Sequence, residues 1–250
     1  MNLRQLWQRR PVPHVLAALI AAAAGLWAFI ALSDEVREGG LHTLDRTILL
    51  AMRNPADPSD PLGPRWFEEF MRDLTGLGGH GVLGLLLLAV ASFLVLAGLR
   101  RTAGSVLAAC LSGAVLSALL KDLFARPRPD LVPHGAYVLS PSFPSGHALL
   151  SALVYLTLAA LVSRHLGQRR LKLHVITVAV LLTMLVGISR VYLGVHWPSD
   201  VLAGWAIGAA WALGWWGIAQ MLATRPGARP AETEAAAEEA LGPRSPGQRG

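Results

Sequence analysis

The chain has 250 residues, a net charge of +6 and 53% hydrophobic residues, and its apolar residues gather into runs long enough to cross a hydrocarbon core, which takes roughly 20 helical residues. Most of the length lies in these runs, so we expect one membrane domain and no separate soluble one. The positive charge does not indicate a nucleic-acid partner, because the basic residues mostly flank the apolar runs and form no aromatic-basic stripe. The single cysteine, Cys110, excludes an intrachain disulfide and a cysteine-based zinc site.

Six apolar runs, each bounded by charges, prolines or glycines, predict six membrane-spanning helices. In chain order they cover Val15–Leu32, Gly81–Leu99, Ala103–Leu120, Ala148–Val162, Val175–Ile188 and Val201–Ala223. The fifth run is short, so we expect its ends to extend into flanking residues. A cleaved signal peptide is the alternative for the first run, but that run exceeds a usual signal core and no clear small-x-small cleavage site follows it. The sequence therefore predicts an all-α fold, a six-transmembrane-helix bundle within residues 1–224.

Arginine and lysine in the short loops predict the orientation of the bundle. In a six-span chain these groups all fall on one side: Arg4, Arg9, Arg10, Arg100, Arg101, Arg164, Arg169, Arg170, Lys172, Arg225 and Arg229. By the positive-inside rule that side is cytoplasmic, so we expect a multi-pass protein of the cell membrane with both termini in the cytoplasm. The tail 225–250 is rich in Ala, Glu, Pro, Gly and Arg, and we expect it to be disordered.

The opposite side carries the long acidic segment Ser33–His80. Within it, the apolar residues of the stretch Trp66–Leu74 recur at helical spacing with charged residues between them. That pattern favours a helix lying in the membrane interface. The alternative is a soluble cap packed on the ends of the spans.

The first of three polar clusters begins where the third span ends and runs from Lys121 to Pro129. Lys121 and Arg128 are cations near the membrane surface with little acid beside them, and such cations hold phosphate, arginine through a bidentate fork and lysine as a point charge. The alternative is that both side chains snorkel to lipid headgroups. The cluster lies on the acidic side, however, where the topology rule does not call for cations.

The second cluster, Pro144–His147, opens the fourth span. Ser145 is a plausible N-cap and Gly146 allows a close backbone approach, so the free N–H groups of the helix start form an anion site. His147 then lies beside that anion and can donate a proton to a leaving oxygen. An ordinary capped helix with an interfacial histidine is the alternative.

The third cluster, Ser189–Asp200, joins the last two spans. His196 and Asp200 are four residues apart across a helix start, and a carboxylate on one imidazole nitrogen fixes the tautomer and frees the other nitrogen to attack. Arg190 adds a third cation. A structural histidine beside a helix cap is the alternative.

All three clusters fall on the same predicted side of the membrane. Together they indicate phosphoryl transfer, with cations that neutralise charge on the equatorial oxygens of the phosphoryl group.

The clusters resemble the signature of the type 2 phosphatidic acid phosphatase superfamily, which reads K-x6-R-P, P-S-G-H and S-R-x5-H-x3-D. Every position is matched here by Lys121, Arg128, Pro129, Pro144, Ser145, Gly146, His147, Ser189, Arg190, His196 and Asp200. The signature covers residues 121–200, and the six-span pattern extends the resemblance to most of the chain.

The resemblance implies a bacterial membrane enzyme that hydrolyses a lipid phosphate or pyrophosphate on the periplasmic or extracellular side. His196 would be the nucleophile and form a phosphohistidine, Asp200 would orient it, and His147 would protonate the leaving group and later help to activate water. The implied phosphate-binding residues are Lys121, Arg128, Ser145, Gly146 and Arg190. No metal or other cofactor would be required. Undecaprenyl pyrophosphate is the first expected substrate, followed by glycerolipid phosphates such as phosphatidylglycerol phosphate and phosphatidic acid.

Two other functions are alternatives. A phosphotransferase that passes phosphate to another lipid would use the same residues. A lipid or ion transporter would explain six spans but not the three clusters, and transporters usually place charged residues near the membrane midplane, whereas the span interiors here are nearly free of charge. The soluble haloperoxidase branch of the superfamily is disfavoured by the spans.

Overall fold

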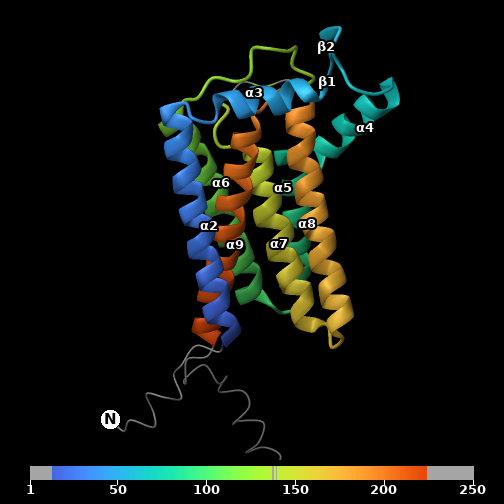
Figure 1. The fold of residues 1–250 in the computed structure, drawn as a ribbon. Helices are drawn as coiled ribbons and strands as arrows, with labels where there is room; N and C mark the ends of the chain where they lie inside the picture. Colours follow the sequence, from blue (N-terminus) through green and yellow to red (C-terminus); the bar gives the residue numbers. More distant parts are fainter. Residues whose placement is uncertain (1–12, 137, 139, 224–250) are drawn as a thin grey trace, which may run out of the picture.

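A computed structural model describes residues 13–136, 138 and 140–223, which form a bundle of long helices (Figure 1). The bundle consists of α2 (Pro13–Glu38), α5 (His80–Leu96), α6 (Arg100–Phe124), α7 (Gly146–His165), α8 (Arg169–Tyr192) and α9 (Pro198–Ala223). The tail 225–250, for which disorder is expected, lies outside the described residues, as do the loop cations before residue 13 and after residue 223.

Five of these helices are long and apolar enough to cross a membrane, within the part of the chain that the structure describes. The sixth, α5, has 17 residues and meets the same test only together with α4 (Arg65–Gly76), from which it is bent by 46°. The prediction of an all-α membrane bundle is thus confirmed, and the second predicted span, Gly81–Leu99, is present as the shorter helix α5. The short fifth run extends at both ends, as expected, because α8 has 24 residues.

A small layer covers one end of the bundle (Figure 1). It contains α3 (His42–Ala51), which lies across the helix ends, and a hairpin of β1 (Arg53–Asn54) and β2 (Asp57–Pro61) that the sequence pattern does not predict. The predicted helix around Trp66–Leu74 is present as α4 and packs against α8 with Met71 and Leu74 buried. Trp66 and Phe70 remain exposed on its other side, so α4 combines a packed face with an exposed apolar one.

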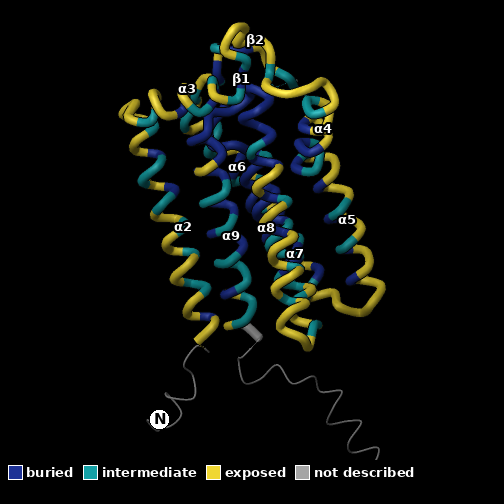
Figure 2. Tube along the Cα trace, turned by 45° about the vertical axis from the view of Figure 1, so that its right-hand side comes forward, coloured by how far each residue is buried: buried dark blue, intermediate teal, exposed yellow. Residues whose placement is uncertain are grey.

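Burial is greatest at the same end of the bundle (Figure 2). The segment Ser189–Val201, which joins α8 to α9, is buried throughout, although it contains several polar and charged residues. The outward faces of the helices are apolar and exposed, as a surrounding hydrocarbon phase requires. The polar residues of the protein's interior therefore gather at the covered end.

The backbones of α7 and α9 approach each other closely at Gly204 and Gly208 on α9. A Cβ atom at Gly208 would lie 2.4 Å from the carbonyl oxygen of Leu149 on α7, so no larger residue fits without a shift. Small residues four apart commonly permit such packing between membrane helices. This contact fixes the starts of α7 and α9 relative to each other.

We predict that Gly208→Ala destabilises the protein by about 1–3 kcal/mol, because the added methyl group overpacks the α7–α9 contact. The measurement is the free energy of unfolding in detergent. Gly214→Ala is the matched control, since nothing lies within 4 Å of a Cβ at Gly214 in the same helix. The control should be neutral or up to about 1 kcal/mol more stable, and equal destabilisation by both changes would contradict the close-packing argument.

Candidate active site

The three sequence clusters meet at the covered end of the bundle. Successive helices run in opposite directions, so the last turn of α6 carries Lys121, the first turn of α7 carries His147, the last turn of α8 carries Arg190 and the first turn of α9 carries Asp200. His196 lies in the buried link between α8 and α9. The structure therefore brings all the predicted site residues to one end of the molecule.

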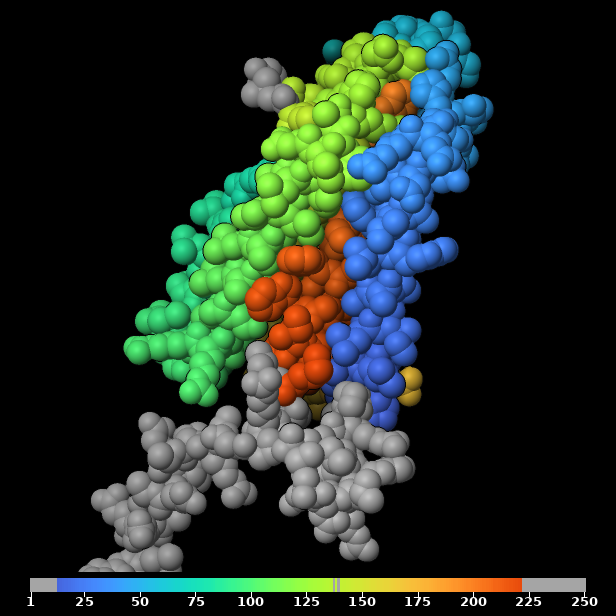
Figure 3. Space-filling model, turned by 90° about the vertical axis from the view of Figure 1, so that its left-hand side faces the viewer, coloured from blue at the N-terminus to red at the C-terminus, as the bar shows by residue number. Residues whose placement is uncertain are grey.

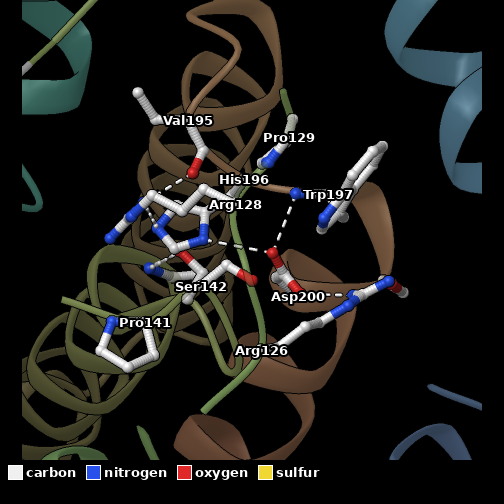
Figure 4. A network of polar contacts seen from close by, with 12 residues as sticks. Arg126, Arg128, Pro129, Pro141, Ser142, Val195, His196, Trp197 and Asp200 are labelled. Atoms are coloured by element: carbon white, nitrogen blue, oxygen red, sulfur yellow. Dashed lines mark hydrogen bonds and ion pairs between the residues drawn. The ribbon is translucent and has the colours of Figure 1, made fainter. Parts of the chain in front are cut away.

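The His196 ring lies between a carboxylate and a guanidinium group (Figure 4). Its Nδ1 is 3.4 Å from Asp200 Oδ2, a long hydrogen bond, and its Nε2 is 3.2 Å from Arg128 Nη1. Arginine can only donate, so Nε2 must present its lone pair and the ring proton must lie on Nδ1, facing Asp200. The geometry thus assigns the tautomer with a free lone pair on Nε2.

The imidazole of His196 is neutral at neutral pH. Complete burial lowers the pKa of His196 well below 6.5, and the positive charges of Arg190, Arg128 and Lys121 lower it further. A neutral imidazole is the nucleophilic form of histidine, because the lone pair is not taken by a proton. The charge around His196 therefore favours the reactive state of the ring.

Asp200 is held by backbone and side-chain donors at the start of α9. Its Oδ2 accepts from the backbone N–H of Trp197 at 2.9 Å, and its Oδ1 accepts from Arg126 Nη1 at 2.6 Å (Figure 4). Its position in the first turn of a helix also stabilises the carboxylate through the helix dipole. Asp200 therefore faces His196 from a fixed position.

Arg126 and Asp45 form a second, deeper layer that sequence reasoning missed. Arg126 Nη2 donates to Asp45 Oδ2 at 2.9 Å while its Nη1 also reaches Ser199 Oγ at 2.8 Å. Asp45, from α3, accepts from Ser199 N at 2.8 Å and from Ser199 Oγ at 2.6 Å. In the sequence Asp45 is one acid among many in its segment, and only its burial beside Arg126 distinguishes it.

Lys121 and Arg128 donate to uncharged acceptors. Lys121 Nζ donates to the carbonyl oxygen of Pro141 at 2.6 Å, and Arg128 donates to those of Ser140 at 2.8 Å and Val195 at 2.5 Å. Neither forms an ion pair with a carboxylate of residues 13–136, 138 or 140–223. Both positive charges therefore remain available to an anion.

Arg190 is buried with an incomplete set of partners. Its side chain is 3% exposed, and Nη1 donates to Thr75 Oγ1 of α4 at 2.9 Å. Its Nε has no hydrogen-bond acceptor among the described residues. A buried donor without an acceptor is costly, and an anion beside it would remove that cost.

The start of α7 contacts both Asp200 and Lys121. Ser145 is the N-cap, with Oγ accepting from Ala148 N at 3.5 Å, and its own N–H donates to the backbone oxygen of Asp200 at 2.9 Å. A Cβ atom at Gly146 would lie 3.4 Å from Lys121 Cε, so the lysine side chain passes directly over this glycine. The predicted N-cap is present, and it lies beside a predicted cation.

His147 faces a glycine turn and a second histidine. Its ring centroid is 6.0 Å from that of His80, which begins α5, and a Cβ atom at Gly79 would lie 4.0 Å from its Nε2. The ring makes no hydrogen bond within the described part of the chain. Both ring nitrogens are thus free to exchange a proton with a ligand.

A glycine and a buried arginine support the loop that carries His196. Gly194 has a φ of +70°, and a Cβ atom there would lie 2.6 Å from Val132 Cγ2. Arg53 of β1 is 3% exposed and donates to the carbonyl oxygen of Tyr192 at 2.7 Å, and burial lowers the pKa of Arg53. The covering layer therefore contacts the loop that carries His196.

The site is suited to an anion. Among the described residues, no group of three or more His, Cys, Asp or Glu side chains is arranged to hold a metal ion. A cavity of about 350 Å³ lies beside the site, and its walls include Arg126, Arg128, Trp197 and His42. Arg128 therefore borders both His196 and an open space.

The sequence also matches a known family. A model of the PAP2 superfamily matches residues 102–223. Phosphatidylglycerophosphatase B of Bacillus subtilis is 36% identical over 183 residues, which cover 72% of this chain and 85% of that protein. The chain belongs to the PAP2 superfamily.

Two further relatives extend the comparison. The crystal structure of a transmembrane PAP2 type phosphatidylglycerolphosphate phosphatase from Bacillus subtilis has a TM-score of 0.70 and 28% identity, covering 80% of this chain and 96% of that one. Undecaprenyl-diphosphatase of Sulfolobus acidocaldarius is 35% identical over 100 residues, 38% of this chain and 44% of that protein. The bundle and its covered end thus belong to a fold already seen in this superfamily.

We predict that Asp45 and Arg126 stabilise the protein as a coupled pair. Arg126→Gln should destabilise it by about 3–5 kcal/mol, because it leaves the buried carboxylates of Asp45 and Asp200 without a cation. Asp45→Asn should destabilise it less, because Arg126 keeps its ion pair with Asp200. The double variant should lose less than the sum by about 0.5–3 kcal/mol. The measurement is the free energy of unfolding in detergent for all four members of the cycle.

The exposed pair Glu68–Arg72 on α4 is the control, because its side chains are 27% and 46% exposed. The cycle of Glu68→Gln and Arg72→Gln should give a coupling of about 0–1 kcal/mol. Additive losses at Asp45 and Arg126 would show that the buried network does not act as a unit.

Proposed function

We propose that this chain is a lipid phosphate or pyrophosphate phosphatase that works through a phosphohistidine on His196 and without a metal. The observation that carries the proposal is the His196 Nε2 lone pair, which faces Arg128 in a buried site. Lys121, Arg128 and Arg190 of this site have no carboxylate partner among the described residues. A neutral nucleophile next to unpaired positive charge is suited to attack on a phosphate ester.

The first step forms a covalent intermediate. His196 Nε2 attacks phosphorus, the new P–N bond forms as the P–O bond to the leaving group breaks, and His147 gives its proton to the departing oxygen. The imidazole becomes positively charged as it bonds, and Asp200, which accepts the Nδ1 proton in a hydrogen bond, stabilises that charge. Arg126 in turn fixes Asp200 in position.

The second step regenerates the enzyme. His147, now neutral, takes a proton from water as the water oxygen attacks phosphorus, and the P–N bond breaks with its electron pair returning to His196 Nε2. Inorganic phosphate leaves. His147 suits both roles because its ring nitrogens have no partner in the described residues.

Phosphate binding replaces contacts that the cations now make with the backbone. Lys121 and Arg128 would exchange the carbonyl oxygens of Pro141 and Ser140 for phosphate oxygens, which are charged and therefore stronger acceptors. Arg190 would gain the acceptor that its Nε lacks. The N–H groups at Ser145 and Gly146 would add the helix-start contribution.

Undecaprenyl pyrophosphate is our first candidate substrate. The site lies at a helix end, so a headgroup enters while the apolar chain stays in lipid, and three cations accommodate a second phosphate. Glycerolipid phosphate is the second candidate, because the relative matched along 85% of its length is named a phosphatidylglycerophosphatase. A phosphotransferase would use the same residues and differs only in the acceptor.

We predict that the purified protein releases phosphate from undecaprenyl pyrophosphate, phosphatidylglycerol phosphate and phosphatidic acid in one detergent system, with kcat/KM highest for the first. Activity should survive EDTA, since no step uses a metal. A soluble short-chain phosphate should be turned over far less efficiently, because it gains nothing from membrane partitioning. Transfer of labelled phosphate to an added lipid alcohol in preference to water would instead establish the phosphotransferase.

The same assay tests the nucleophile. His196→Gln keeps a polar side chain of similar size but cannot attack, so it should abolish turnover while leaving the protein folded. A rapid acid-free quench of the wild type should trap base-stable, acid-labile phosphate on the protein, and the variant should trap none. His165→Gln, at the far end of α7, is the control and should behave like the wild type. Normal turnover by His196→Gln would refute the mechanism.

We also propose that the covered end, with the catalytic residues, faces the periplasm or the cell exterior, and that the loop between α7 and α8 is cytoplasmic. The loop cations Arg100, Arg101, Arg164 and Arg169 support this placement, because they all lie at the end opposite His196.

We predict the labelling of two single cysteines placed in a Cys110→Ala background. Ala56→Cys, at the exposed hairpin, should react with an impermeant thiol reagent in intact cells, whereas Gln168→Cys, in the exposed loop between α7 and α8, should react only after the cells are permeabilised. Both positions should react in detergent, which controls for accessibility. The reverse pattern in cells would overturn the placement.

A further inference from the structure

A second hollow lies at the end of the bundle opposite His196. It has a volume of about 520 Å³, lies between α6, α7 and α9, and is lined at its mouth by Arg101, Arg164, Trp215 and Trp216. We call this hollow the basal cavity. Figure 3 views the face of the molecule on which α6 and α9 lie side by side. A neighbouring hollow of about 480 Å³ shares Arg164 and Trp216 and adds Lys172.

Within the part of the chain that the structure describes, the basal end carries positive charge without acidic partners. Every acidic residue between positions 13 and 223 lies at the other end, on the covering layer or at the helix ends beside it: Asp34, Glu35, Glu38, Asp45, Asp57, Asp60, Glu68, Glu69, Asp73, Asp122, Asp130 and Asp200. Within that part of the chain neither Arg101 nor Arg164 forms an ion pair or a hydrogen bond. Among residues 13–223, no acidic side chain therefore lies at the mouth of the basal cavity.

The wall of the cavity is mostly apolar. On α6 it runs from Arg101 to Ala109, nine residues that span about 12 Å along the helix axis. Ala160 on α7 and Ala212 on α9 leave the space open, because larger side chains there would fill it. A cationic mouth above an apolar trough fits an amphiphile with an anionic head and a hydrocarbon chain.

Three small polar side chains also line the cavity, Thr102, Ser105 and Thr157. Thr157 Oγ1 is shielded from solvent, so it does not face the open space. Trp215 and Trp216 line the cavity as well, and tryptophan favours the boundary between headgroups and hydrocarbon.

We propose that the basal cavity binds an anionic phospholipid, with the headgroup phosphate between Arg101 and Arg164 and one acyl chain along α6 and α9. No histidine of the described residues lines the cavity, and His196 lies at the opposite end, so we expect a lipid held there to be a bound component rather than a substrate. Basic pockets between membrane helices are a known way of holding anionic headgroups. This proposal does not rest on the proposed function, since it concerns binding at the opposite end of the molecule.

The test is lipid binding by the full chain in detergent, measured as bound lipid in native mass spectrometry and as the shift in melting temperature. Phosphatidylglycerol, a phosphodiester that carries one negative charge, should bind and stabilise, whereas phosphatidylcholine of the same chain length should not. Arg101→Gln with Arg164→Gln should weaken phosphatidylglycerol binding roughly tenfold or more.

Two matched variants separate this site from general surface charge. Arg169→Gln with Arg170→Gln removes the same charge from the same end outside the cavity and should leave binding unchanged, and Arg101→Lys with Arg164→Lys should retain most of it. Equal weakening by the two glutamine pairs would overturn the proposal. So would equal binding of phosphatidylglycerol and phosphatidylcholine by the wild type, a result that needs no variant to fold.

Discussion

The buried contact of Arg126 with Asp45 and Asp200 is the constraint on which the covered end depends. Arg126 follows α6, Asp45 belongs to α3, and Asp200 begins α9, so one guanidinium group joins the covering layer to the bundle. The same contact holds the carboxylate that faces His196. Fold and site therefore share a single anchor, and Ser199, which contacts both Asp45 and Arg126, closes the network.

This anchor also divides the charges of the site into two groups. The carboxylates of Asp45 and Asp200 are both taken by Arg126, which leaves Lys121, Arg128 and Arg190 without a negative partner in the described part of the chain. A buried arginine is costly without a compensating negative charge, and at this site Arg126 receives both carboxylates. The remaining cations are held in place by backbone oxygens and by Thr75, which position them without cancelling their charge.

Sequence reasoning located the helices and the three clusters because both leave local patterns. Apolar runs predict spans, and residues such as His196 and Asp200 lie four apart on a helix start. Asp45, Thr75, His80 and the hairpin left no such pattern, since their importance comes from contacts between segments far apart in the chain. Arg126 stood inside the first cluster, yet its role depends on Asp45, which is 81 residues away. The 46° bend between α4 and α5 leaves no local pattern either, although the sequence predicted a helix at each place.

All the candidate site residues lie at one end of the bundle, and this placement limits which lipids can reach them. A lipid in the far leaflet holds its headgroup about 30 Å away, across the hydrocarbon core. Such a lipid cannot reach the candidate site until it crosses the bilayer. Under the proposed function, a pool made on the far side must therefore cross the bilayer before it is hydrolysed, and the released phosphate enters a single aqueous compartment.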